Sequence, residues 1–181
     1  MARPITFLSD YGYEDEFAGI CRAVIAAIVP EAAVIDLTHG IKRHAIRQGA
    51  AVLANALPYA PPGVHLAVVD PGVGSPRRAV AVMVGSDDRV LVGPDNGLLW
   101  QAIERFGGAV DAVDVSLSRF RLEPISATFH GRDVFAPVAG HSKPLSGPTS
   151  TLSSGATRTA SARRGEPTPG STTARCTPAG A

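Results

Sequence analysis

The sequence of 181 residues predicts an α/β domain with a layered sheet of largely parallel strands and flanking helices. Short β-branched runs alternate with longer segments in which apolar residues recur at helical spacing. The helical segments end before a proline or a glycine pair, which are common helix stops. Hydrophobic residues make up 45% of the chain and charged residues 18%, a balance typical of globular proteins.

Six runs rich in β-branched residues are the predicted strands, and three segments of helical period lie between them. The strands are expected at residues 5–8, 33–37, 64–69, 79–84, 90–92 and 112–115. The helices are expected at residues 17–28, 45–57 and 99–106. The resulting order begins strand, helix, strand, helix, strand, which is the order of a layered α/β domain.

The composition changes abruptly at His141, so we divide the chain into an α/β domain, residues 1–140, and a tail, residues 141–181. Ser, Thr, Pro, Gly, Ala and Arg dominate the tail, and it has no aromatic residue. Such a segment buries too little apolar surface to offset its ordering entropy, so a disordered, low-complexity tail is expected. Residues 133–139 read like the start of a structured segment that does not continue. We therefore favour a frameshifted tail over a genuine one.

Charge, cysteine content and the N-terminal sequence limit the partners and the compartment. A formal net charge of +1 gives no bulk attraction to nucleic acid or to an anionic membrane, so neither partner is expected. No signal-peptide pattern precedes residue 5, so a cytoplasmic location is expected. Cys21 and Cys176 form neither a disulfide framework nor a metal-binding motif, and Cys21 is expected in the core.

Polar side chains follow the ends of the predicted strands, where ligand crevices form in an open α/β sheet. Asp10 follows the first strand, and an acidic run that contains Asp15 opens the next helix. Asp70 and Arg77 lie in the segment after the third strand, and Asn96 follows the fifth. Their shared placement indicates a site at this edge of the sheet.

Several polar residues also have a structural interpretation. Carboxylates are favoured at a helix N-terminus by about 0.3–1 kcal/mol, so Asp15 is either a helix-end residue or a ligand. His44, beside two basic residues, is expected to be solvated, with a substrate-lining role as the alternative. His39 is interpreted as a satisfied polar residue near a strand end, and His65, inside a strand, as structural.

Asp70, Arg77 and His130 resist a purely structural interpretation when they are taken together. A carboxylate, a guanidinium and an imidazole in loops could converge on one water molecule. Asp70 would accept its proton, His130 would hydrogen-bond it, and Arg77 would keep the carboxylate ionised. Sequence spacing alone does not establish that the three side chains meet.

Four motifs in order resemble the S-adenosylmethionine (SAM) hydrolase and fluorinase family, also called SAM hydroxide adenosyltransferases. The resemblance extends from about residue 4 to about residue 140. The motifs are residues 8–12 (LSDYG), 69–74 (VDPGVG) followed by Arg77, 93–99 (GPDNGLL) and 129–133 (FHGRD).

The resemblance implies that residues 1–140 are the catalytic N-terminal domain of a homotrimer. In this family SAM binds between that domain and a β-barrel-like C-terminal domain of the neighbouring subunit. Here the second domain is expected to be absent. The trimer is therefore expected for intact members rather than for this chain, and little or no activity is expected of the chain as written.

The resemblance also assigns roles to individual residues. Asp70, Arg77 and His130 match the set that positions a water or hydroxide in hydrolases. Asp10 falls where the family binds the ribose hydroxyls, and Gly131 lies beside the nucleophile pocket, where halogenating members have a serine. Asp15, His44 and Asn96 are further candidates for substrate binding, although relatives carry an aromatic ring at the position of His44.

The predicted reaction is hydrolysis of SAM to adenosine and L-methionine, with SAM as substrate, no cofactor and no metal. The sulfonium already activates C5′, so positioning and electrostatics should carry the reaction. Halide transfer is disfavoured because fluorinases have tyrosines at the positions of Asp70 and His130, and a carboxylate would repel a halide.

Two other functions stay open. One is a non-catalytic remnant that binds adenosine or SAM. The other is a metal-dependent phosphoesterase, because several side chains are possible ligands for a hard metal: Asp10, His39, Asp70, Asn96 and His130.

Overall fold

The computed structural model describes residues 2–85 and 88–142, so all but the first two residues of the predicted tail lie outside the described residues. The chain alternates strands and helices, as its sequence pattern predicts. The elements are β1 (Ile5–Ser9), α1 (Phe17–Ile28), β2 (Val34–Thr38), α2 (Ile46–Ala56), a 3₁₀ turn (Leu57–Tyr59), β3 (Val64–Val68), β4 (Ala79–Val84), β5 (Arg89–Pro94), α3 (Trp100–Arg105), β6 (Ala109–Asp114), a π-helical turn (Gly131–Phe135) and α4 (Ala136–His141).

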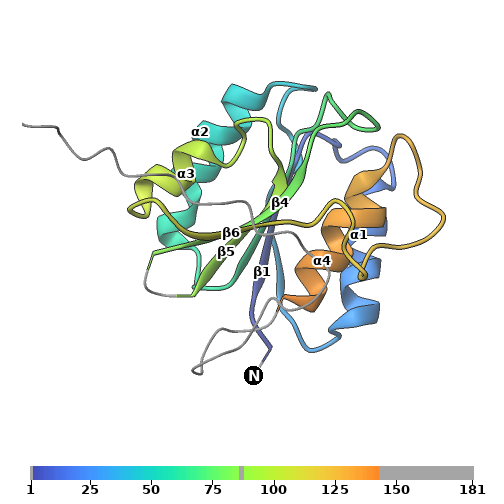
Figure 1. Cartoon of the computed structure of the whole chain (residues 1–181), viewed down its shortest axis with the longest axis horizontal. Coiled ribbons are helices and arrows are strands. Elements are labelled where there is room, and N and C mark those ends of the chain that lie inside the picture. The colour runs from blue at the N-terminus through green and yellow to red at the C-terminus, as the bar shows by residue number, and fades with distance from the viewer. Residues whose placement is uncertain (1, 86–87, 143–181) are drawn as a thin grey trace, which may run out of the picture.

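One six-stranded sheet, in the order β2-β1-β3-β5-β4-β6, forms the centre of the domain (Figure 1). The pairs β1–β2, β1–β3 and β3–β5 are parallel. Strand β4 runs antiparallel to both of its neighbours, β5 and β6. The expectation of a largely parallel sheet is confirmed, and all six predicted strands are present.

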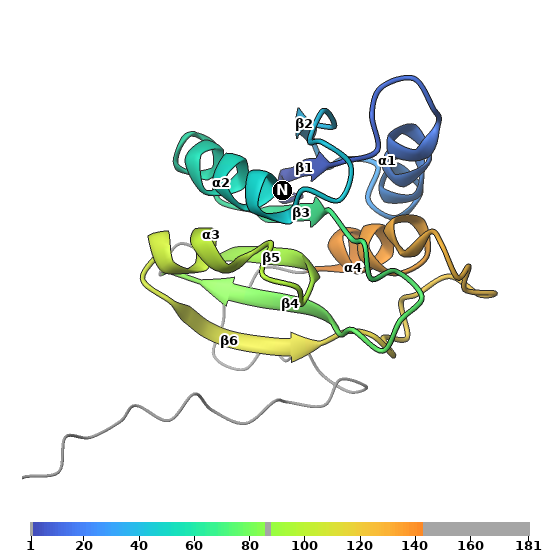
Figure 2. The same cartoon turned by 90° about the horizontal axis from the view of Figure 1, so that it is seen from above.

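Helices cover both faces of the sheet (Figures 1 and 2). Helices α2 and α3 lie against one face, and α1 and α4 pack against each other on the opposite face. Successive side chains of a strand point to opposite faces, so Phe7 of β1 packs towards α1 and α4 while Leu8 packs towards α2. The domain therefore has two apolar cores, one on each side of the sheet.

Helix α1 buries Ala18, Cys21 and Ile25, which recur at intervals of three and four residues. Cys21 is fully buried, as predicted for a core residue. Helix α2 buries the face that includes Leu53 in the same way. Within the described part of the chain, no helix has the length and apolar character needed to cross a membrane.

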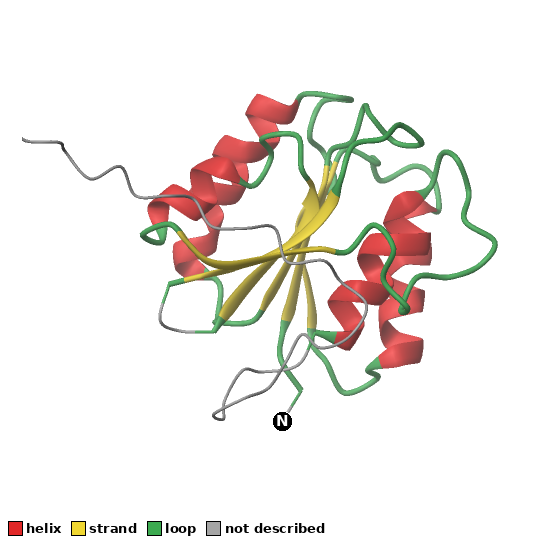
Figure 3. Ribbon diagram, viewed as in Figure 1, coloured by secondary structure: helices red, strands yellow, loops and turns green. Residues whose placement is uncertain are grey.

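The direction of β4 determines where the functional loops meet. The segment after β3 enters β4, which starts at the edge of the sheet where the parallel strands end. The loops after β1 and β2 leave the sheet at that same edge, as the loop colouring of Figure 3 makes visible. In open α/β sheets this edge is the usual place for a ligand crevice.

Candidate active site

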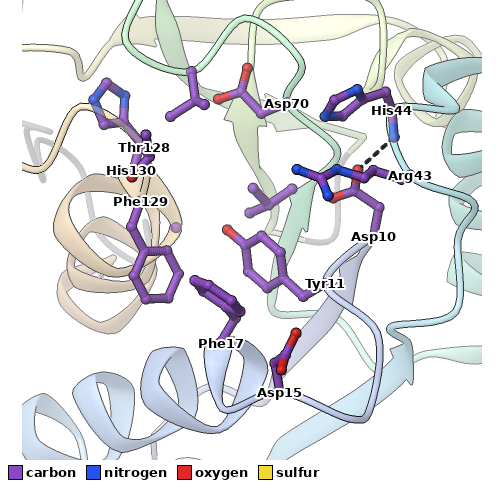
Figure 4. Close-up of a pocket in the computed structure, with 13 residues that line it drawn as sticks. Asp10, Tyr11, Asp15, Phe17, Arg43, His44, Asp70, Thr128, Phe129 and His130 are labelled. Atoms are coloured by element: carbon purple, nitrogen blue, oxygen red, sulfur yellow. Dashed lines mark hydrogen bonds between the residues drawn. The ribbon is translucent and has the colours of Figure 1, made fainter.

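A pocket of about 270 Å³ opens at this edge of the sheet (Figure 4). It contains most of the polar residues that the sequence singles out, together with aromatic and basic side chains. Its lining consists of Asp10, Tyr11, Asp15, Phe17, Arg43, His44, Val68, Asp70, Val73, Thr128, Phe129, His130 and Gly131.

Asp70 and Arg77 form an ion pair at the inner wall of the pocket. Their side chains are 5% and 11% exposed. Arg77 Nε donates to both carboxylate oxygens of Asp70 at 2.9 Å, and Nη2 donates to Oδ2 as well. The guanidinium also lies 5.2 Å from the centre of the Phe135 ring. Since Arg77 does not line the pocket itself, it acts on the site through Asp70 and His130.

His130 continues this network. Arg77 Nη2 lies 2.9 Å from His130 Nδ1. A guanidinium can only donate hydrogen bonds, so Nδ1 must accept and the ring proton must be on Nε2. Burial, reinforced by the charge of Arg77, lowers the pKa of His130. The imidazole is therefore held neutral with its ring proton on Nε2, while a hydrogen bond with the backbone of Ser126 acts on the pKa in the opposite direction.

Two glycine-containing turns bring the three residues together. Ser75 Oγ donates to the carbonyl of Gly72 at 2.6 Å and accepts the Arg77 amide, which folds the loop between Asp70 and Arg77 back on itself. Gly74 has a φ of +78°, and a Cβ there would lie only 2.5 Å from the carbonyl oxygen of Ala127. This close approach packs the loop after β3 against the segment that leads to His130.

Asp10 lies at the end of β1 and binds the loop that precedes α2. Its Oδ2 accepts the backbone N–H of His44 at 2.8 Å (Figure 4). His44 adopts a φ of +64°, which is uncommon for a residue other than glycine. None of the described residues donates a hydrogen bond to the second carboxylate oxygen, Oδ1. One oxygen of this carboxylate thus fixes the loop, and the other is available to a ligand.

The sequence pattern did not identify an aromatic wall made by Tyr11, Phe17 and Phe129. The ring centres of Phe17 and Phe129 are 4.9 Å apart, and Tyr11 lies 5.9 and 5.8 Å from them. Phe17, the first residue of α1, is 39% exposed and lines the pocket. Tyr11 and Phe129 were noted only as parts of motifs. Aromatic residues directly before or after polar motif residues are the signal that could have indicated this wall.

A comparison with known protein families identifies the group to which this arrangement belongs. The family model described as the SAM hydroxide adenosyltransferase N-terminal domain matches residues 5–150. The chain belongs to this family. The match includes every residue that lines the pocket.

The family includes hydrolases and fluorinases. An (R)-S-adenosyl-L-methionine hydrolase from Salinispora tropica is 53% identical over 135 residues, 75% of this chain and 51% of the relative. A fluorinase from Actinoplanes sp. is 23% identical over 159 residues, 76% of this chain and 53% of the relative. A conserved protein from Thermotoga maritima, known from its crystal structure, aligns with a TM-score of 0.72 and 39% identity over 76% of this chain and 53% of that one. The chain thus spans about half the length of these relatives.

Asp15 and Asn96, two predicted substrate ligands, have different surroundings. Asp15 lies exposed at the rim of the pocket, and no side-chain hydrogen bond caps α1. Asn96 does not line the pocket. Its Nδ2 donates to the carbonyl of Val69 at 2.9 Å, and its Oδ1 accepts the amide of Leu98. Asn96 therefore links the loop after β5 to the end of β3.

Ser9, His39 and Asp36 resemble a hydrolase triad but are not placed for catalysis. Ser9 Oγ lies 2.8 Å from His39 Nδ1, and His39 Nε2 lies 3.3 Å from Asp36 Oδ1 without hydrogen-bond geometry. Ser9 is fully buried, and its hydroxyl also accepts the amide of Tyr11. No substrate could reach this serine, so Ser9 and His39 hold the base of the loop after β1. The prediction that His39 is a satisfied polar residue is wrong for Nε2, which is buried without a hydrogen-bond partner among the described residues.

The other histidine predicted to be structural is fully buried in β3. His65 Nδ1 lies 2.9 Å from Thr6 Oγ1, and Nε2 lies 3.3 Å from Arg89 Nη1. The structural interpretation of His65 is thus confirmed. Among residues 2–85 and 88–142, no three His, Cys, Asp or Glu side chains gather as a metal site would need.

Proposed function

We propose that the protein hydrolyses SAM to adenosine and L-methionine, with a water molecule attacking C5′ in line with the departing sulfur. One observation carries the proposal: the Asp70–Arg77–His130 network ends in the same pocket as the carboxylate of Asp10. The network can hold a nucleophile, and a carboxylate can bind a ribose diol. These are the two functions that SAM hydrolysis requires of this domain.

The chemistry needs few groups because SAM is a sulfonium. The water oxygen forms a bond to C5′, the C5′–S bond breaks, and sulfur keeps the electron pair as the neutral thioether of methionine. One proton of the water passes to the carboxylate of Asp70. No cofactor takes part, and the rate enhancement comes from alignment and preorganised electrostatics.

Each member of the network has one task. Arg77 pairs with the buried carboxylate of Asp70 and fixes its orientation, with Nε donating to both of its oxygens. His130 is neutral and donates from Nε2, so it can hold one lone pair of the water while another faces C5′. Because His130 Nδ1 accepts from Arg77, we assign the role of base to Asp70 and not to the histidine.

The opposite side of the pocket binds the nucleoside and the amino acid. Asp10 accepts hydrogen bonds from the ribose hydroxyls, with His44 held beside it by the backbone contact. Asp15 and Arg43 line the pocket with opposite charges, which suits the zwitterionic end of methionine. Gly131 lies next to His130 at the nucleophile side.

The residues present favour water over a halide as the nucleophile. The carboxylate of Asp70 would repel an anion in the same small site. The identity of 53% to a SAM hydrolase, against 23% to a fluorinase, supports the same preference. The alternative of adenosine binding without turnover shares this pocket but needs no aligned water.

Little or no activity is expected of the chain as written, so the test uses a parent protein in which the chain is joined to the second domain of a hydrolase relative. This protein is incubated with SAM in water enriched in ¹⁸O, and adenosine and methionine are measured. Attack at C5′ should place ¹⁸O in the 5′-hydroxyl of adenosine and none in methionine. The matched control is His130→Ala, which should release less adenosine and still bind it. Binding of adenosine by calorimetry without any product would select the non-catalytic alternative and overturn the proposed hydrolysis.

A further inference from the structure

The hydroxyl of Tyr11 is a polar group of the pocket to which the mechanism above gives no role. Tyr11 follows Asp10 directly, and its backbone N–H donates to Ser9 Oγ at 3.3 Å. Its ring is packed edge-on against Phe7 and Phe129, with centroid distances of 6.3 and 5.8 Å. The ring is therefore fixed on several sides, and the position of its hydroxyl is fixed with it.

Gly131 provides the space that this hydroxyl occupies. A Cβ at residue 131 would lie 1.9 Å from Tyr11 Oη and 2.9 Å from Cζ, so no other amino acid fits without displacing the phenol. Residue 131 adjoins His130, whose ring belongs to the network with Arg77. The absence of a side chain at Gly131 thus brings the phenol close to the nucleophile side of the pocket.

The Tyr11 hydroxyl points into the pocket (Figure 4), and no described residue forms a hydrogen bond with it. Most buried polar groups in proteins have a hydrogen-bond partner. A hydroxyl without one on the wall of a pocket therefore indicates that a water molecule or a ligand binds there. Burial, together with the charges of Asp10 and Asp70, raises the pKa of Tyr11. The phenol therefore keeps its proton at neutral pH.

We propose that the Tyr11 hydroxyl is a further contact of the reacting water, and that Gly131 is the residue that admits it. The inference rests on the proposed hydrolysis. The attacking water directs one lone pair to C5′, receives a hydrogen bond from His130 and gives one proton to Asp70. Its second proton remains without a partner in that scheme, and the oxygen of Tyr11 accepts it. The phenol is not consumed, because it keeps its own proton throughout.

The first experiment compares Tyr11→Phe with Tyr59→Phe in the parent protein that carries the second domain. Tyr11→Phe removes only the hydroxyl and keeps the aromatic wall, so kcat for adenosine release should fall about 10- to 100-fold, the range for one preorganised polar group. The Kd of adenosine should stay within about twofold. Tyr59 is 91% exposed, so the same chemical change there should leave kcat unaltered.

The second experiment uses the contact between Oη and residue 131. Gly131→Ala should be severely damaging beside Tyr11 and less so in the Tyr11→Phe protein, where the contact of 1.9 Å with Oη is gone and the contact of 2.9 Å with Cζ remains. Gly131→Ser combined with Tyr11→Phe returns a hydroxyl to the same space. It should recover part of the lost kcat, whereas Gly131→Ala in that background should not. A purely structural role for Tyr11 would predict no difference between serine and alanine.

The outcomes separate this inference from the proposed function. If Tyr11→Phe keeps the parent kcat while His130→Ala loses it, the inference is wrong and the hydrolysis stands. If the serine variant recovers no more than the alanine variant, the water contact is also rejected. If the parent protein itself releases no adenosine from SAM, the inference falls together with the proposed function.

Discussion

The two sides of the pocket differ in how much of their hydrogen bonding the protein satisfies by itself. On the side of β3 and β4, Asp70, Arg77 and His130 are paired with one another before any ligand enters. On the side of β1, Asp10 offers a free oxygen and Tyr11 an unpaired hydroxyl. The paired side is preorganised for chemistry, and the open side is left for the substrate to complete. The predictions below test this division, beginning with the largest expected effect.

Removing a member of the paired side should affect turnover and spare binding. Replacing Arg77 by Ala should lower kcat for SAM about 10²–10³-fold, because Asp70 and His130 lose the guanidinium that holds both of them in place. The Kd of adenosine should change little. Steady-state kinetics and calorimetry check both values. An Arg77→Ala protein with the parent rate would show that the network is not the nucleophile site.

Removing a residue of the open side should affect binding first. Asp10→Ala should weaken SAM and adenosine alike, by about 10- to 100-fold, since two hydrogen bonds to a charged acceptor are lost. The matched control is Asp95→Ala, because Asp95 forms an exposed ion pair with Arg78 away from the pocket and should not alter either Kd. A loss of kcat with unchanged affinities would instead assign Asp10 to the chemistry.

The loop that joins the two sides should be sensitive to a methyl group at Gly74. Gly74→Ala combines a positive φ with a collision against the carbonyl of Ala127 and should cost about 2–3 kcal/mol of folding free energy. Gly97 has a φ of +93° with nothing within 4 Å of a Cβ, so Gly97→Ala should cost only about 1 kcal/mol. Urea denaturation compares the two. Equal losses would mean that the contact with Ala127 does not hold the loop.

The smallest effect concerns the titration of His130. Its pKa is lowered, so the folded protein disfavours the protonated ring. Stability linked to this group is complete above the ordinary value of about 6.5 and declines as pH falls through the lower folded value. NMR titration should give His130 a midpoint below the ordinary value. In Arg77→Met the midpoint should rise, because the guanidinium lowers it and Asp70 raises it; an unchanged or lower midpoint would contradict the assigned cause.

Much of the fold follows from local patterns in the sequence. All six strands and the three helices before residue 107 lie where β-branched runs and helical spacing predict them, within a few residues. The reversed direction of β4 was not predicted, because alternation of side chains is the same for parallel and antiparallel strands. The convergence of Asp70 with Arg77 depends on that direction. Local patterns in the sequence could therefore suggest this convergence, but they could not establish it.

The pocket residues likewise fall into those that the sequence could predict and those that it could not. Most of the candidate residues line the pocket, namely Asp10, Asp15, His44, Asp70, His130 and Gly131. Asn96 instead turns to the backbone at Val69 and Leu98. An amide in a turn can bind a ligand or the chain equally well, so its residue type does not decide between them. The sequence could not predict the place of the Tyr11 hydroxyl in the pocket, because that hydroxyl occupies the space left by the absent side chain of Gly131. Tyr11 and Gly131 are 120 positions apart in the sequence, so the local pattern around neither residue indicates their contact.

The π-helical turn at Gly131–Phe135 has a consequence for how this segment can evolve. A π turn contains one residue more than an α turn, so a single deletion within it would restore α-helical winding. Everything before the deletion would then rotate by about 100° relative to α4. His130 would leave Arg77 while Phe135 stayed in the core. The number of residues in this stretch of chain therefore cannot change without breaking the contact between His130 and Arg77.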